Sequence, residues 1–150
     1  MTRRKRNANP RVVLAAAFAV LAGACVTGTE VELSELTGLW NVGEAVYIGV
    51  VDPAQTANLS ELGFSATMDI AADGAFNMVI TGGMIDALTG QFAVDGNELE
   101  ITIDGRVFPG EVFIEDDRAV LRILGGGVMY DFDGDGDEEA ALLFLILDRV

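Results

Sequence analysis

The sequence contains no histidine, one cysteine and a single lysine, Lys5. Without these side chains, most combinations of a nucleophile with a general base cannot be assembled. A lone thiol also cannot form an intramolecular disulfide, so an exported domain must be held together by its core. Paired carboxylates remain available for glycoside hydrolysis, but nothing in the sequence marks such a pair at a cleft. We therefore predict that the protein is not an enzyme.

The sequence also lacks an apolar run of the roughly 20 residues that a membrane-spanning helix needs. The apolar stretch from Val12 to Ala22 is shorter than that, and five basic residues and no acid precede it. A basic segment, a short apolar segment and then small residues are typical of a signal peptide. We expect a signal peptide over residues 1–24, and therefore export.

The small residues lead directly into the segment Leu21-Ala22-Gly23-Ala24-Cys25. This segment resembles the bacterial lipobox, although its leucine lies one position earlier than usual. The resemblance implies cleavage before Cys25 and a lipid anchor on that residue, with palmitate as an acyl chain. The residue that follows is not the aspartate that retains some lipoproteins at the inner membrane, which favours the outer membrane. The alternative is an ordinary secretory signal with an incidental cysteine.

Cleavage before Cys25 changes the charge balance, because all 24 acidic residues lie after that position. Only four arginines remain to balance them, so the mature chain has a net charge of −20. Such a surface repels nucleic acid and anionic lipid head groups, and nucleic acid is excluded as a partner. We expect residues 25–35 to be a tether and residues 36–150 to be one domain, with the chain a monomer.

Short runs of β-branched and aromatic residues follow from Leu39 onward, and no stretch holds a helical apolar period. Apolar and polar residues alternate within several runs, as in Phe64 to Ile70 and Leu99 to Asp104. This alternation assigns one face of each strand to the core and the other to water. The pattern predicts an all-β fold with eight strands, near residues 39–50, 63–71, 75–82, 87–94, 98–104, 110–116, 119–130 and 140–149.

The connections between these runs are short and suit antiparallel hairpins. Asp73-Gly74, Asp95-Gly96 and Asp104-Gly105 supply residues that adopt the positive φ of tight turns. The exception is the link from Val51 to Leu62, where we expect a flap with a helical turn. Closure of an up-and-down meander removes both exposed edges, so we predict a small closed barrel.

The first run opens with Leu36-Thr37-Gly38-Leu39-Trp40. This motif resembles the Gly-x-Trp that begins strand one of lipocalins and of bacterial lipocalin-like proteins. The resemblance covers residues 36–150 in layout, and it implies that Gly38 and Trp40 lie at a barrel floor with Arg149 packed across the tryptophan. It further implies a small apolar ligand. The chain is shorter than typical lipocalins and has no long C-terminal helix.

Two roles for the barrel interior stay open. An eight-stranded barrel holds either one small ligand or its own side chains. The residues that we expect to fill it are Phe64, Met68, Phe76, Met78, Phe92 and Phe144. The sequence therefore allows a ligand-binding domain or a scaffold. A transmembrane barrel is opposed by the acidic residues on the predicted water-facing sides of the strands.

The segment from Asp131 to Glu139 carries most of its side-chain oxygens on alternate residues. Hard oxygen ligands at such spacing, with glycine at the sharp turn, are typical of a calcium loop. The predicted Ca2+ ligands are Asp131, Asp133, Asp135, Asp137 and Glu139. Leu142 stands where an EF-hand has its bidentate glutamate, so a true EF-hand is excluded. A solvated acidic turn is the alternative, and a calcium-dependent interaction or adhesion module with a filled barrel is the corresponding alternative function.

Overall fold

The computed structural model describes residues 30–82, 86–125 and 127–150. The predicted signal peptide, Cys25 and the first residues of the tether lie outside these ranges. Within them the protein has ten strands and one four-residue helix, so the prediction of an all-β fold is confirmed. The one helix of this part of the chain is too short to span a membrane.

The elements follow one another with short links. They are α1 (Leu33–Leu36), β1 (Gly38–Gly49), β2 (Thr56–Asn58), β3 (Ser65–Ile70), β4 (Ala75–Thr81), β5 (Ala87–Asp95), β6 (Glu98–Ile103), β7 (Arg106–Glu115), β8 (Arg118–Ile123), β9 (Met129–Tyr130) and β10 (Glu139–Arg149).

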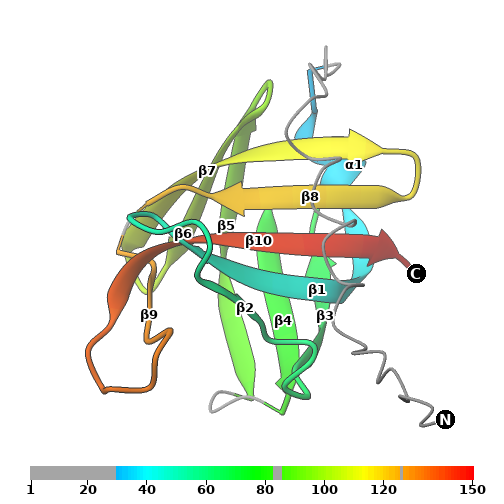
Figure 1. Ribbon diagram of the computed structural model, residues 1–150. Coiled ribbons are helices and arrows are strands. Elements are labelled where there is room, and N and C mark those ends of the chain that lie inside the picture. Colours follow the sequence, from blue (N-terminus) through cyan, green and yellow to red (C-terminus); the bar gives the residue numbers. More distant parts are fainter. Residues whose placement is uncertain (1–29, 83–85, 126) are drawn as a thin grey trace, which may run out of the picture.

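Eight of the strands form a closed antiparallel barrel in the order β1, β3, β4, β5, β6, β7, β8, β10 (Figure 1). The last strand pairs with the first, from Trp40 with Arg149 to Gly49 with Ala141, and this pairing closes the barrel. The predicted eight-stranded meander and its closure are therefore confirmed. Two short strands extend the wall, β2 beside β1 and β9 beside β10.

The two ends of the barrel are built differently. We call the end that holds α1, the start of β1 and the end of β10 the floor. The opposite end, which holds the β1–β3 link and the β9–β10 link, we call the mouth. Tight hairpins join the strands at the floor, and the longer links gather at the mouth (Figure 1).

The predicted hairpin glycines adopt the backbone conformation that short turns require. At the turn between β6 and β7, Asp104 has φ +50° and Gly105 φ +75°. Two consecutive positive φ angles are typical of the type I′ turn, whose twist matches that of the flanking strands. Gly74 and Gly96 likewise have positive φ in two of the three hairpins at the floor.

The core consists of the inward-facing side chains of the barrel strands. Alternation is strict in β3, where Ala66, Met68 and Ile70 are buried and the residues between them are exposed. β6 and β8 bury every second residue in the same way at their centres. Trp40, Leu121 and Leu147 are fully buried near the floor. No described polar or charged residue is buried.

Three details of the predicted strands are wrong. The link from Val51 to Leu62 contains the strand β2, which was not predicted and whose backbone pairs with Val46 to Ile48 of β1. A turn follows it, in which the N–H of Leu62 donates to the carbonyl of Leu59 at 3.0 Å. The single strand predicted over 119–130 is two strands, β8 and β9, which pair with different parts of β10. β7 begins at Arg106, not at residue 110, and includes Pro109, whose carbonyl accepts the N–H of Leu124 at 2.9 Å.

One predicted interior residue lies on the outside. Phe144 pairs across the sheet with Arg122, whose guanidinium lies 5.7 Å from the centre of the phenylalanine ring. The inner face of β10 belongs instead to Leu145 and Leu147, which are buried. Residues 140–147 are all apolar, so alternation in this strand carries no information about which face is inside.

Candidate functional site

Three regions are candidates for a functional site: the barrel interior, the floor and the mouth. The interior is the natural place for a ligand in a small barrel. Five of the residues that we expected there point inward, and Met68, Phe76, Met78 and Phe92 keep only 2% to 7% of their surface exposed. Phe64 is half-buried and packs against the same core. Side chains therefore occupy the floor half and the centre of the barrel.

Aromatic packing contributes to this filling. The rings of Phe76 and Phe92 stack with their centres 4.7 Å apart. Gly90 leaves the room that this stack needs, because a Cβ at Gly90 would lie 2.6 Å from the Phe76 ring and 2.3 Å from the carbonyl oxygen of Thr102. The interior is thus built around direct contacts between side chains.

The floor brings the three predicted floor residues together. The guanidinium of Arg149 lies 4.2 Å from the centre of the Trp40 ring, which is fully buried. The Trp40 Nε1–H donates to the carbonyl of Leu36 at 2.7 Å. Gly38, with φ +126°, turns the chain between α1 and β1. A Cβ added at Gly38 would lie 3.5 Å from the Arg149 guanidinium.

Arg149 also closes the end of the helix. Its Nη1 donates to the carbonyl of Thr37 at 3.2 Å and its Nη2 to the carbonyl of Glu35 at 2.6 Å. These carbonyls lie at the C-terminus of α1, where a helix lacks internal donors and a cation is favourable. Arg149 therefore ties the last strand to the helix that covers the floor.

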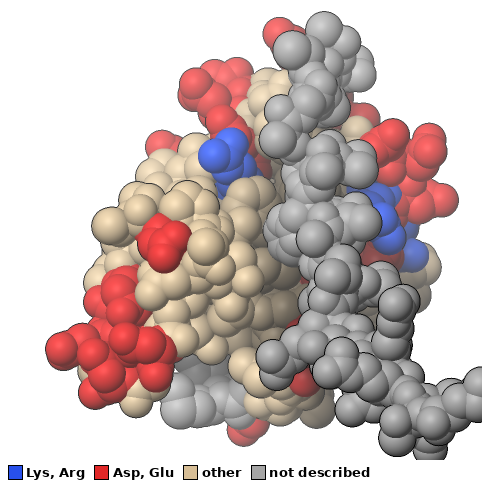
Figure 2. Space-filling view, in the orientation of Figure 1, with Lys and Arg blue, Asp and Glu red and all other residues tan. Residues whose placement is uncertain are grey.

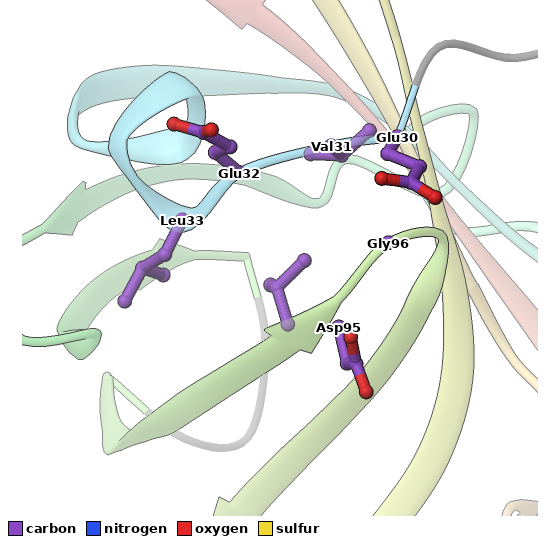
Figure 3. A pocket seen from close by; sticks show the side chains of 7 residues that line it. Glu30, Val31, Glu32, Leu33, Asp95 and Gly96 are labelled. Atoms are coloured by element: carbon purple, nitrogen blue, oxygen red, sulfur yellow. The ribbon is translucent and has the colours of Figure 1, made fainter.

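The segment before the helix packs on the barrel as well. Val31 is buried, and its N–H donates to the carbonyl of Gly96 at 3.2 Å. A shallow cleft of about 660 Å³ lies beside this contact, between Glu30 to Leu33 and the end of β5 (Figure 3). Glu30, Glu32 and Asp95 contribute acidic groups to its lining, beside the apolar Val31, Leu33 and Val94.

At the mouth, the acidic segment forms a compact loop. Asp131, Asp133 and Asp135 each place a carboxylate oxygen within 4.8 Å of the others. Asp131 accepts the N–H of Gly134 at 2.7 Å and that of Gly136 at 3.0 Å. The loop projects from one corner of the molecule as a dense acidic patch (Figure 2).

The other two predicted ligands lie outside this group. Asp137 donates its backbone N–H to the Asp135 carboxylate at 2.8 Å, and its own carboxylate is not part of the cluster. The Glu139 carboxylate accepts the N–H of Phe132 at 3.1 Å. Asp52, in the link between β1 and β2 at the same end of the barrel, accepts the N–H of Ala54 and so caps its own turn. The described residues thus offer three clustered carboxylates.

An aromatic cluster, which the sequence did not lead us to expect, attaches the acidic loop to the barrel. Tyr47 stacks on Tyr130 with ring centres 4.7 Å apart, and Tyr130 meets Phe132 edge-on at 5.0 Å. Burial raises the pKa of Tyr47, and the neighbouring Tyr130 and Glu138 raise it further. The aromatic residues on either side of Asp131 were the available signal, but their partner Tyr47 is distant in the sequence.

Comparisons with known proteins leave the chain unassigned. No family model, no curated protein and no solved structure matches it.

Proposed function

We propose that the protein is a lipid-anchored, non-catalytic domain of lipocalin-like design, whose barrel is a rigid scaffold that presents its mouth to partners. The observation that carries this proposal is the packing of side chains in the floor half and the centre of the barrel. Side chains that line an open pocket keep surface accessible to water, whereas Phe92, Leu99, Val112 and Leu121 keep 0% to 2%. The filled interior favours a scaffold over a carrier of a ligand inside the barrel.

The chemistry of the described residues supports a non-catalytic role. Catalytic carboxylates usually owe their reactivity to partial burial and to a charged neighbour. All described polar and charged side chains are at least partly exposed. The acidic loop offers oxygen ligands and turn geometry, but no nucleophile with an adjacent base.

A cavity-forming variant tests whether the interior is filled. We expect the parent chain to bind no xenon or benzene in its interior, as measured by NMR. Phe92→Ala should bind one equivalent, because it removes a buried ring and apolar cavities of that size take up such probes. A stoichiometric apolar compound recovered by solvent extraction of the purified parent chain would refute the scaffold.

A second candidate role is binding of a small apolar ligand at the mouth. The inward-facing residues near the mouth are only partly buried, unlike those near the floor. They are Phe64, Ile80, Leu88, Ile103, Phe108 and Leu143. If a ligand binds there, Leu88→Ser should abolish the recovery of an extracted compound, and Val94→Ser at the floor end of the same strand should not.

We further propose that the acidic loop binds calcium. Three carboxylates within 4.8 Å of one another fit part of a shell that needs six to eight oxygens, and carbonyls and water would supply the rest. A dissociation constant on the order of 0.1 to 1 mM is expected for an extracellular site. Isothermal titration should show calcium binding to the parent chain and none to the Asp133→Asn, Asp135→Asn double variant.

A matched control separates a specific site from general attraction to an acidic surface. The turn between β7 and β8 also has two adjacent acids, Asp116 and Asp117, at the opposite end of the barrel. The Asp116→Asn, Asp117→Asn variant removes the same charge and should bind calcium like the parent. An equal loss of calcium binding in both double variants would mean that the acidic loop contains no specific calcium site.

Export and anchoring rest on residues 1–25 and are tested separately. Cells grown with labelled palmitate should incorporate it into the parent chain, and Cys25→Ser should remove the label and release the domain from the membrane fraction. Incorporation that persists in Cys25→Ser would contradict the lipid anchor.

A further inference from the structure

One arginine at the mouth differs from the other arginines of the described chain. Arg118 and Arg122 each form an ion pair, and Arg149 donates to two backbone carbonyls at the floor. Arg106 forms no ion pair and no side-chain hydrogen bond among the described residues. All 24 acidic residues lie within the described ranges. Arg106 is therefore a cation without an acidic partner in a strongly acidic chain.

The strand register places Arg106 on the inner face of the barrel, at the rim of the mouth. It is the first residue of β7 and pairs with Ile103, which packs against the core. Residues directly opposite each other in an antiparallel pair share a face of the sheet. Phe108, two residues further along β7, also packs against the core, as the alternation of a strand requires. Arg106 is thus on the face that borders the opening of the barrel.

The surroundings of the Arg106 guanidinium leave its donors available. Its Cζ lies 5.7 Å from the centre of the Phe108 ring. A Cβ added at Gly127, in the link after β8, would lie 3.2 Å from its Nη2. A ring attracts the positive charge but offers no oxygen to the five N–H donors of a guanidinium. These donors can therefore meet an oxygen of a ligand at the mouth.

The inner face of the mouth beside this cation is apolar. Six inward-facing residues pack against the core but are only partly buried. They are Phe64, Ile80, Leu88, Ile103, Phe108 and Leu143. Deeper in the barrel, Met78 and Phe92 are buried and fill the centre. An apolar chain can therefore cover the partly buried residues at the mouth, but it cannot extend down the axis of the barrel.

We propose that the mouth binds an amphipathic carboxylate, with its apolar chain on these partly buried residues and its carboxylate on Arg106. This inference rests on the second role proposed above, binding of an apolar ligand at the mouth, and adds the head group of that ligand. The planar fork of a guanidinium matches a carboxylate and donates two parallel hydrogen bonds to it. A phosphate monoester fits less well, because its charge of about −1.5 to −2 exceeds that of one arginine.

The charge of the rest of the molecule provides a sharp contrast. The chain has a net charge of −15, and of −20 once residues 1–24 are removed, so its field attracts cations and repels anions. Without a specific donor, the mouth should prefer an alkylammonium to an alcohol of the same chain length, and the alcohol to a carboxylate. Binding through Arg106 predicts the reverse order.

Three ten-carbon probes test this order on the full chain with Cys25→Ser, in which no lipid can be attached at that position. They are decanoate, 1-decanol and decylammonium, each used below the concentration at which it forms micelles. Isothermal titration should give the tightest binding for decanoate and the weakest for decylammonium. Arg106→Gln in this background should weaken decanoate binding by about tenfold and change decanol binding by less than about twofold.

Two further variants and one measurement control for charge and folding. Arg118→Gln, at the floor, removes the same charge and should leave the order of the three probes unchanged. Arg106→Lys should keep part of the preference for decanoate, because an ammonium retains the charge but lacks the fork. In NMR spectra of the chain without either change, decanoate should shift the Nε–H resonance of Arg106 and decanol should not. This readout does not depend on how a variant folds.

The possible results separate this inference from the role on which it rests. Equal binding of decanoate and decanol, both lost in Leu88→Ser, would support an apolar site at the mouth and overturn the role of Arg106. Binding of none of the probes would overturn both. Tighter binding of decylammonium than of decanoate, or an equal loss of decanoate binding in Arg106→Gln and Arg118→Gln, would mean that only the overall charge matters and would overturn the inference.

Discussion

The floor and the mouth of the barrel are closed by different kinds of contact. At the floor, Trp40 is fully buried, its indole N–H is hydrogen-bonded to Leu36, and Arg149 covers its ring. At the mouth, Phe64 and Ile80 keep part of their surface exposed. The mouth is covered by the stack of Tyr47 on Tyr130 and by longer links.

This difference follows from the connections. Tight hairpins at the floor leave little backbone to cover, so one helical turn and one arginine suffice. The mouth carries the first link and the loop between β9 and β10, whose carboxylates must remain in water. We therefore expect the floor to determine global stability, and the mouth to tolerate change and to carry interactions.

Removal of the floor tryptophan should have the largest effect. Trp40→Ala is expected to lower the free energy of unfolding by about 3 to 5 kcal/mol, because it empties a fully buried site. Phe64→Ala at the mouth should cost less than half as much, since its ring is only partly buried. Urea denaturation followed by circular dichroism measures both. Equal losses would show that the mouth is packed as tightly as the floor.

Replacing the arginine that covers the tryptophan should have a smaller but clear effect on stability. Arg149→Gln removes the cation over the ring and at least one hydrogen bond to a helix carbonyl, and should cost about 1 to 2 kcal/mol. Arg118→Gln, which breaks only an exposed ion pair with Asp148, should change little. Thermal melting compares the two. A similar loss for both would mean that Arg149 acts merely as a surface charge.

The mouth should respond to alkaline pH through Tyr47. Its pKa lies above the usual value of 10, because burial, Tyr130 and Glu138 disfavour the tyrosinate. The stabilising contribution of the neutral form is complete below the unfolded pKa and is lost as pH rises through the folded pKa. Unfolding measured above pH 10 should therefore depend less on pH in Tyr47→Phe. An absorbance titration in which Tyr47 ionises at or below its usual value would contradict this.

The smallest effect on stability is expected in the acidic loop. Asp131→Ala removes the acceptor for the N–H groups of Gly134 and Gly136. Hydrogen exchange at these two amides should accelerate, while the free energy of unfolding changes by less than about 0.5 kcal/mol. If the free energy of unfolding fell by much more than that value, the loop would contribute to global stability, and the two ends of the barrel would not differ in this respect.

Much of the barrel could be predicted because its signals are local. Alternation in Ala66, Met68 and Ile70 assigns an inner face, and Asp104-Gly105 specifies a turn type by its φ angles. The number of barrel strands, their antiparallel order and the closure followed from such signals. The proximity of Trp40 and Arg149 was expected from the resemblance and from the return of an eighth strand to the floor.

The candidate site was less accessible to sequence reasoning. The spacing of Asp131, Asp133 and Asp135 indicated a turn that gathers oxygens, and these three do cluster. Asp137 and Glu139 share that spacing, but their carboxylates lie outside the cluster, and that of Glu139 accepts the N–H of Phe132 instead. The stack of Tyr47 on Tyr130 joins residues far apart in the chain, and no local pattern reports such a contact.

The sequence by itself determined the all-β class, the eight-stranded meander and the acidic surface, since periodicity, turn chemistry and charge are local properties. Only the tertiary structure decided which face of β10 is inside. All residues from 140 to 147 are apolar, so the choice rests on register with β1 and β8, which buries Leu145 and leaves Phe144 outside. That register, and not any motif, decides which apolar side chains of β10 fill the barrel.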